Sequence, residues 1–181
     1  MQPARSLTIS SNGITRIIQS ECHFSAGFDA NVAGAGTPPV LHKFNAIWDT
    51  GASGSVITKE VVETCDLKPT GMVQTHHAQG MQLAETFLVN IFLPNGVQFV
   101  NVPVILGVLP GGSHALIGMD IITTGDFCIT NYNGRTVCSF RWPSCECTDY
   151  VAESNRLAKK KVHTTGGFSG GHAKGRRHKH R

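Results

Sequence analysis

The amino-acid sequence predicts an all-β fold, a closed or nearly closed β-barrel that is interrupted by one or two short helices. Short apolar or alternating segments recur along the chain with turn sequences between them, which is typical of an antiparallel barrel. Glycine is frequent, with 20 residues, and only 15% of the residues are charged, as suits a fold rich in strands and turns. The 40% of hydrophobic residues provide enough apolar material for a core.

The strands are predicted from alternation and from the turn residues that separate them. Residues 18–24 alternate with a period of two, which indicates a strand. Thr58 is the expected N-cap of a helix over about 59–65, a second short helix should follow Gly118, and Pro103 suggests a strand edge or a bulge. The predicted strands cover residues 18–24, 44–48, 72–78, 81–93, 97–106, 115–117, 127–131 and 136–140.

Composition and charge divide the chain into four parts. An N-terminal strand and loop extension (1–39) precedes the main domain (40–142), which a linker (143–155) connects to a basic tail (156–181). Residues 1–155 hold 7 Lys and Arg against 12 Asp and Glu, whereas the tail holds 9 Lys and Arg and no acid. Because the tail has no apolar period, we expect it to be disordered. Its charge would either contact nucleic acid or an anionic surface weakly or only keep the chain in solution.

The six cysteines are scattered, and the chain lacks the usual export signals. No apolar segment of the secretory type follows Met1, and no run of about 18 apolar residues occurs, so no membrane span is expected. We therefore expect free thiols in a reducing, cytoplasmic compartment. Cys145 and Cys147 have no second pair at zinc-site spacing, so neither a metal nor another cofactor is expected.

The segment from Phe44 to Ser53 is the best candidate for a reactive site. An apolar strand runs directly into Asp49, which Thr50 and Gly51 follow. A carboxylate in such a place is costly unless it is hydrogen-bonded or shares a proton with another acid. Thr50 offers a hydroxyl, and Gly51 lets the backbone turn sharply. The alternative interpretation is an ordinary turn or cap aspartate.

Two motifs in this order and spacing resemble the signatures of retropepsin-like aspartic proteases. The first is Asp49-Thr50-Gly51-Ala52, and the second is Ala115-Leu116-Ile117-Gly118-Met119-Asp120. Between them lies a hairpin with Gly80 at its expected tip, where that family has its flap. The resemblance covers residues 40–142 and implies a retropepsin-type barrel with a flap hairpin and one half-site per chain.

The resemblance also implies roles for individual residues. Asp49 would be the catalytic acid, and Thr50, Gly51 and Ala52 would support its loop. Thr50 would hydrogen-bond to the partner loop, and Gly51 would offer its carbonyl to the substrate. Leu116 and Ile117 would wall the cleft, with Gly118 beneath the catalytic loop. The flap and substrate-binding residues would be His77, Ala78, Gln79, Gly80, Leu116, Ile117 and Gly118.

Aspartic proteases use two carboxylates that share one proton, and this chain contains one Asp-Thr-Gly. Asp120 is not followed by Thr/Ser-Gly, so we interpret it as a helix-start or hydrogen-bonding residue. The number of motifs therefore predicts a homodimer in which Asp49 of each chain faces its twin across a two-fold axis. Ser53 and Met119 replace the acid and the arginine that viral members carry, so the salt bridge between those positions is not expected.

The sequence therefore predicts an aspartic endopeptidase that hydrolyses peptide bonds in polypeptides with a water activated by two Asp49 carboxylates. One alternative is a catalytically silent module of the same fold that dimerises or binds. The other is a nucleic-acid-associated protein that acts through its basic tail. The intact Asp49-Thr50-Gly51 favours the enzyme, because a binding module does not need a dyad carboxylate.

Overall fold

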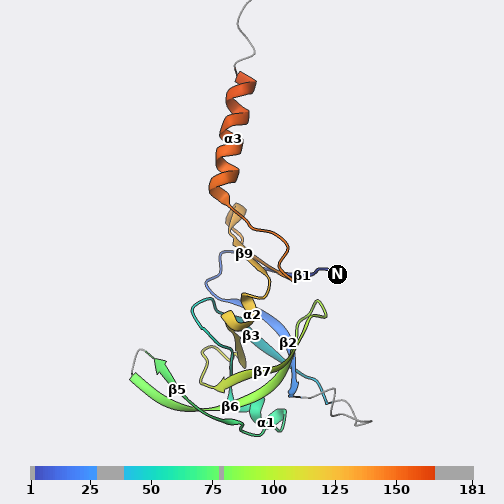
Figure 1. Cartoon of the computed structure of the whole chain (residues 1–181), viewed down its shortest axis with the longest axis vertical. Coiled ribbons are helices and arrows are strands. Elements are labelled where there is room, and N and C mark those ends of the chain that lie inside the picture. The colour runs from blue at the N-terminus through green and yellow to red at the C-terminus, as the bar shows by residue number, and fades with distance from the viewer. Residues whose placement is uncertain (1–2, 28–38, 78–79, 166–181) are drawn as a thin grey trace, which may run out of the picture. The chain divides into compact units, whose positions relative to one another are not determined.

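The computed structural model describes residues 3–27, 39–77 and 80–165 (Figure 1). These residues divide into two compact units, Met1–Glu146 and Cys147–Arg181. The elements of the first unit are β1 (Arg5–Ser10), β2 (Ile18–Ala26), β3 (His42–Trp48), β4 (Val56–Ile57), α1 (Lys59–Thr64), β5 (Gly71–His77), β6 (Gly80–Phe92), β7 (Gln98–Leu106), β8 (Ala115–Ile117), α2 (Met119–Ile122), β9 (Asp126–Thr130), the 3₁₀ turn η1 (Tyr132–Gly134) and β10 (Val137–Trp142).

Six strands of the first unit form a closed barrel. They pair in the order β2-β3-β8-β4-β7-β6, and β6 pairs back with β2 to complete the circle. The closing pairs run from His23 opposite Phe92 to Ala26 opposite Val89. β5 continues beyond the barrel as the partner of β6, and the two form a long hairpin (Figure 1). The predicted closed β-barrel with a flap hairpin and short helices is confirmed.

Alternation along the strands fills the barrel. On β3 the side chains of Phe44, Ala46 and Trp48 point inward and are buried. Burial of a large apolar side chain contributes about 1.5–3 kcal/mol, so this alternation fixes which face of β3 is inside. The next residue, Asp49, therefore falls at the point where the chain leaves the core. The wider core also includes Phe24, Ile57, Val61, Phe87, Val89, Ile91, Val104, Ile117, Ile121, Cys138 and Phe140.

A β-bulge lies where β2, β6 and β7 meet. Val89 pairs with Val102, and the next registered pair is Ile91 with Phe99. Between these two pairs, β6 has one residue, Asn90, and β7 has two, Val100 and Asn101. The buried Asn90 amide bonds both sides: its Nδ2 donates to the Ala26 carbonyl at 3.1 Å, and its Oδ1 accepts from the Asn101 backbone at 2.9 Å. Asn101 has a positive φ of 53°, which asparagine tolerates. The bulge thus completes the junction that closes the barrel.

A second, three-stranded sheet has the order β1-β10-β9. It joins the two ends of the first unit, since Arg5 lies opposite Trp142 and Ser10 opposite Val137. Phe127 of β9 and Phe140 of β10 pack against Trp48 at the end of β3, with ring centroids 5.7 and 5.1 Å apart. The N-terminal strand β1 was not predicted, although its Leu7 and Ile9 alternate with polar residues.

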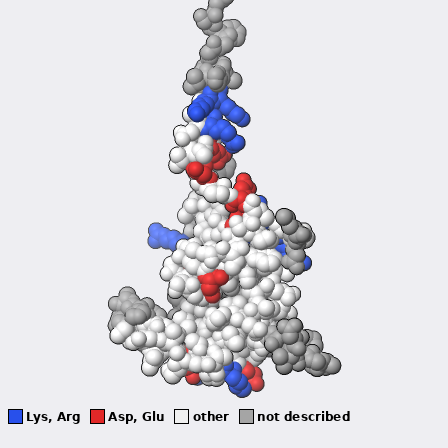
Figure 2. Space-filling model, viewed as in Figure 1, with Lys and Arg blue, Asp and Glu red and all other residues white. Residues whose placement is uncertain are grey.

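The second unit contains α3 (Tyr150–Thr165), so residues 156–165 of the tail, which were expected to be disordered, are helical. Asp149 caps this helix, since its Oδ1 accepts from the backbone of Val151 and Ala152 at 2.9 and 3.0 Å. Acidic residues near the start and basic residues farther along also favour a helix through the macrodipole. Figure 2 shows these basic side chains gathered on α3. Residues 166–181 lie outside the described part of the chain.

Several smaller points complete the comparison with the sequence. Thr58 occupies the N-cap position of α1, but its side chain makes no capping bond within the described residues. Gly80 is the first residue of β6 and pairs with His77, so the hairpin tip lies at 78–79, outside the described residues. Most of the predicted loop at 26–39 is also outside them. Pro103 sits on a stretch of β7 that β4 does not reach, as expected at a strand edge. No described helix is long and apolar enough to span a membrane.

Candidate active site

Asp49 directly follows β3, a strand that pairs with β2 on one side and with β8 on the other. β3 and β8 run parallel, with Ile47 opposite Leu116 and Trp48 opposite Ile117. The Asp49 backbone continues this pairing by donating to the Ile117 carbonyl at 3.0 Å. The Trp48 indole donates to the Ser20 hydroxyl at 2.9 Å, which fixes the last buried side chain before the loop. The acid therefore leaves the core at a defined position.

The residues after Asp49 fold back on its carboxylate. The Gly51 backbone N–H donates to Asp49 Oδ1 at 2.8 Å. A Cβ on residue 51 would lie 3.1 Å from that same oxygen, which is closer than ordinary contacts, so glycine gives the carboxylate room. Thr50 and Gly51 are exposed, whereas Asp49 and Ala52 are half-buried. The loop thus orients one carboxylate at the surface and keeps its own outer residues accessible.

A hydrogen-bonded clamp holds this loop from below. Ser55, which is 2% exposed, donates to both oxygens of Asp120, from its backbone at 3.1 Å and from its hydroxyl at 2.9 Å. The same hydroxyl accepts from the Gly118 backbone at 3.1 Å, and the Met119 backbone donates to the Ala52 carbonyl at 2.8 Å. Ser55 and Asp120 therefore tie α2 to the far end of the Asp49 loop. We call these two residues the loop clamp.

Asp120 was predicted as a helix-start or hydrogen-bonding residue, but its partner was not foreseen. Ser55 lies 65 positions earlier, and a serine at the end of a loop does not by itself indicate burial. The available signal was its position immediately before the apolar pair Val56-Ile57. A hydroxyl there must enter the core with its neighbours and then needs a partner.

The predicted cleft residues divide between surface and core. Leu116 is half-buried, and Gly118 lies so close to the loop that a Cβ would come within 2.6 Å of the Gly54 carbonyl oxygen. Ile117 is fully buried, so its side chain belongs to the core of this chain and differs from the expected cleft wall. The physical reason is that Ile117 alternates with Leu116 on a short central strand with neighbours on both sides.

The β5–β6 hairpin carries exposed apolar side chains on one face. Met72, Met81 and Leu83 are each more than 60% exposed. Met81 and Leu83 alternate in step with the buried Phe87 on β6, and Met72 lies opposite Glu85 in the same set. The face that begins in the barrel core therefore continues outward along the hairpin. Of the predicted flap residues, Ala78 and Gln79 lie outside the described part, and His77 and Gly80 are described only in their backbone.

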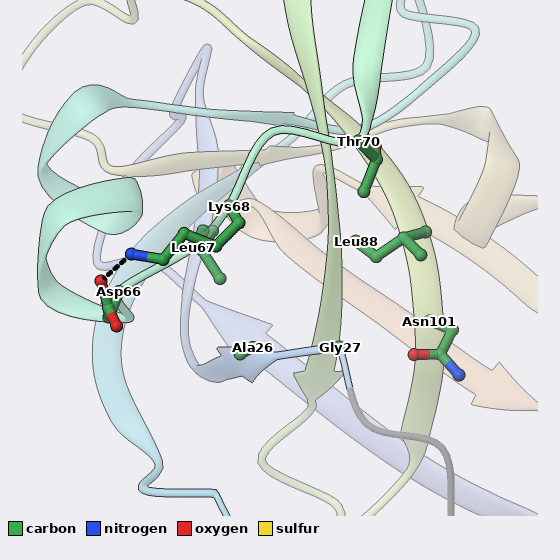
Figure 3. Close-up of a pocket in the computed structure, with 8 residues that line it drawn as sticks. All are labelled: Ala26, Gly27, Asp66, Leu67, Lys68, Thr70, Leu88 and Asn101. Atoms are coloured by element: carbon green, nitrogen blue, oxygen red, sulfur yellow. Dashed lines mark hydrogen bonds and ion pairs between the residues drawn. The ribbon is translucent and has the colours of Figure 1, made fainter. Parts of the chain in front are cut away.

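A hollow of about 580 Å³ lies elsewhere, and no residue of the Asp49 loop lines it (Figure 3). Its lining comes from the end of β2, the segment between α1 and β5, and the facing parts of β6 and β7. Its charged groups are Asp66 and Lys68, which pair with each other at 2.6 Å and are both largely exposed. Leu88 and Asn101 form the opposite side. Because its charges satisfy each other and it is remote from Asp49, we do not assign the chemistry to it.

Asp120 and Asp126, the first two acids after β8, are committed to other partners, so they do not complete a dyad with Asp49. Asp120 belongs to the loop clamp. Asp126 accepts from the Ser144 hydroxyl at 2.5 Å, from the Cys145 backbone at 2.9 Å and from Arg141 Nε at 2.8 Å. These hydrogen bonds hold the pKa of the Asp126 carboxyl well below its usual range. Among the described residues, one chain therefore offers one oriented carboxylate of the predicted kind, that of Asp49.

Comparison with known proteins gives one family match and several similar structures. Residues 41–124 match the family described as "gag-polyprotein putative aspartyl protease". A crystal structure of a retropepsin-like aspartic protease from Rickettsia conorii is 18% identical, covers 77% of this chain and 95% of its own, and has a TM-score of 0.46. The solution structure of Simian Foamy Virus (mac) protease is 14% identical, covers 59% and 92%, and has a TM-score of 0.38. The comparison with curated proteins gives no match.

Proposed function

We propose that this chain is an aspartic endopeptidase that works as a homodimer, because residues 41–124 match a family of putative aspartyl proteases, in agreement with the resemblance of the two sequence motifs. Its substrate is a polypeptide, and the reaction is hydrolysis of a peptide bond. The water is activated by two Asp49 carboxylates, one from each chain. No metal or other cofactor takes part in this proposal.

The observation that carries the proposal is the geometry of the Asp49 loop. The Gly51 backbone holds Asp49 Oδ1 at 2.8 Å, at the surface end of a buried strand. An aspartate that only capped a turn would not need the additional clamp of Ser55 and Asp120 beneath its loop. A loop that is tied to the barrel on both sides is a pre-organised site, and pre-organisation is what a catalytic group requires.

The chemistry follows from two such carboxylates held close together. Two negative charges at short distance cannot both persist, so the pair keeps one proton between them and titrates as a unit. The ionised member takes a proton from the attacking water, and the protonated member gives its proton to the oxygen of the scissile carbonyl. As the tetrahedral intermediate collapses, the leaving amine receives a proton, and the two acids return to their starting state.

The hairpin of β5 and β6 suits an extended peptide as substrate. Its exposed apolar face, formed by Met72, Met81 and Leu83, would contact substrate side chains when the hairpin covers the site. Covering the site also excludes bulk water, which strengthens the electrostatic interactions within it. The proposal therefore favours peptides with apolar side chains around the cleaved bond.

Cleavage of a mixed peptide library by the full-length chain tests this function, with Asp49→Asn as the decisive variant. The substitution keeps the size of the side chain but removes the shared proton and the base. We expect cleavage by the wild-type chain, a loss of about 10³-fold or more in Asp49→Asn, and inhibition of the wild type by a statine-type transition-state analogue.

Asp66→Asn is the matched control, because it makes the same change at an aspartate that is 87% exposed in its side chain and outside the site. It should cleave at the wild-type rate. If dimeric wild-type protein cleaves no peptide, or if Asp49→Asn retains full activity, the chain is not an aspartic peptidase. The silent dimerisation module would then be the better interpretation.

A further inference from the structure

We propose that the helix α3 is a contact surface for nucleic acid, and that its exposed basic face binds the phosphate backbone without reading the base sequence. This is a second activity, in the unit Cys147–Arg181, and it does not rest on the peptidase function proposed for the other unit. The helix gives the first basic residues of this unit a fixed arrangement, which a tail that only keeps the chain in solution does not need.

Three basic side chains lie on one face of α3. Arg156, Lys159 and Lys160 follow one another at helical spacing, so they are neighbours on the helix surface, and all three residues are exposed (Figure 2). The step from Arg156 to Lys160 covers about 6 Å along the helix axis, which spans about two phosphate steps of one duplex DNA strand. The face can therefore meet successive phosphates with adjacent cations.

Acidic residues are confined to the start of this helix. Glu153 is the last acid of the sequence, whereas residues 156–181 hold 9 Lys and Arg. Asp149 is engaged as the cap, since its Oδ1 accepts from two backbone N–H groups of the first turn. Among the ion pairs of the described residues, none joins Arg156 or Lys159 to a carboxylate. Positive charge therefore accumulates along α3 without acids to neutralise it, which suits a polyanionic partner.

The apolar side chains of α3 favour nucleic acid over an anionic membrane surface. A helix that lies in a membrane interface buries a continuous apolar face, whereas the large apolar side chains described on α3 are those of Tyr150, Val151 and Leu157. Glu153 lies one turn before Leu157 and therefore beside it on the helix, so a bilayer that buried Leu157 would bring a carboxylate close to anionic headgroups. Binding to phosphates in water needs only the basic face.

Contacts of this kind have a characteristic dependence on salt and on base sequence. Each phosphate that a Lys or Arg neutralises releases counterions, so the logarithm of the binding constant falls with the logarithm of the salt concentration by about 0.9 per contact on duplex DNA. The three cations of this face would together contribute about 2.7 to that slope. Contacts to the phosphate backbone carry no direct sequence information, so duplexes of unrelated sequence should bind alike.

Fluorescence anisotropy of a labelled DNA duplex of about 20 base pairs, titrated with the full-length chain between about 50 and 200 mM KCl, tests the proposal. The variant is the triple substitution Arg156→Gln, Lys159→Gln and Lys160→Gln. Glutamine has nearly the helix propensity of lysine and arginine, so α3 should persist, which far-UV circular dichroism checks. We expect the wild type to bind, and the triple variant to have a dissociation constant raised about tenfold or more and a salt slope lowered by about 2–3.

The matched control is the triple substitution Lys43→Gln, Lys59→Gln and Lys68→Gln, which removes the same charge from the first unit, where each lysine pairs with an acid. It should change the dissociation constant by less than about twofold, because those lysines are not on the proposed face.

Four results would overturn the proposal. The first is a wild-type chain that binds no duplex at the lowest salt concentration, and the second is an equal loss of affinity in both triple variants, which would show an effect of net charge alone. The third is an unchanged salt slope in the α3 variant. The fourth is binding to vesicles of phosphatidylcholine and phosphatidylserine without binding to the duplex, which would assign α3 to a membrane surface. Each result leaves the peptidase proposal untouched.

Discussion

Removal of the Asp120 carboxylate should loosen the catalytic loop and lower the stability of the whole unit. The carboxylate accepts two hydrogen bonds from Ser55, at 3.1 and 2.9 Å. In Asp120→Ala, the donors of Ser55, which is 2% exposed, lose their acceptors within the barrel. Among the hydrogen bonds of the described residues, Asp120 is the only side chain of α2 that bonds to Ser55.

The magnitude follows from these two bonds. A hydrogen bond to a charged group contributes about 1.5–3 kcal/mol, and two such bonds set an upper limit of about 6 kcal/mol. Asp120 is exposed, so water can replace part of the loss. We therefore expect Asp120→Ala to lower the free energy of unfolding by about 2–4 kcal/mol. Asp120→Asn keeps one acceptor oxygen and should lose only about 1–2 kcal/mol.

Urea unfolding of the wild type, both Asp120 variants, Ser55→Ala and the double variant measures this effect. If Ser55 and Asp120 act as a unit, the two alanine substitutions should be non-additive by about 1–2 kcal/mol. Glu63→Ala, at a side chain that is 65% exposed on α1, is the control and should change the stability by less than about 0.5 kcal/mol.

Activity provides the second measurement. In the proposed homodimer, a displaced loop would move Asp49 away from its twin, and kcat should then fall by about 10–100-fold in Asp120→Ala, with a partial recovery in Asp120→Asn. If Asp120→Ala has the same urea midpoint and the same kcat as the wild type, the clamp contributes nothing, and the reasoning from these hydrogen bonds is wrong.

Three further predictions concern packing, pH and thiol chemistry. Gly118→Ala should lower the free energy of unfolding by about 1–3 kcal/mol, because its Cβ would lie 2.6 Å from the Gly54 carbonyl oxygen; Gly54→Ala, whose Cβ would meet no atom within 4 Å, should be nearly neutral in the same urea titration. Asp126→Asn should be less stable than the wild type at neutral pH, and the difference in stability should shrink as the pH falls below 3.8. The reason is that the stability contributed by a carboxyl with a lowered folded-state pKa is lost between its unfolded-state and folded-state pKa values. Guanidinium unfolding between about pH 2 and pH 7 measures this difference, and a difference that grows in acid contradicts the prediction. At about pH 8 the exposed thiols of Cys145 and Cys147 should alkylate rapidly, whereas burial raises the pKa of three other thiols to about 11 and should protect them until the chain unfolds; rapid labelling of any of these in the folded protein, read by peptide mass spectrometry, is the contrary result. The protected thiols are those of Cys22, Cys65 and Cys138.

Local sequence patterns predicted most of the barrel, because alternating apolar residues and turn residues mark its strands in the sequence. Residues 44–48, 97–106 and 115–117 were predicted as strands, and the structure has β3, β7 and β8 there. The Asp49 loop was predictable for the same reason, since Asp49, Thr50 and Gly51 follow one another directly in the sequence. These features depend on neighbours in the chain, which a single sequence displays directly.

Features that depend on distant partners were not predictable in this way. β1 is held by β10, more than 120 residues away, and among its six residues only Leu7 and Ile9 are apolar, a pattern too short to establish a strand without its partner. The pairing of β2 with β6 that closes the barrel and the bond between Ser55 and Asp120 are likewise long-range. The helix α3 was missed for a different reason: its stability comes from the Asp149 cap and from charge order rather than from an apolar face.

Closure of the barrel by strands of a single chain has a consequence for regulation. Because β6 returns to β2 within the same chain, each subunit of the proposed homodimer would keep its core when its partner leaves. The separated chains would then stay folded and inactive instead of unfolding and aggregating. Local concentration alone could switch such a protein on, rapidly and reversibly, without any refolding step.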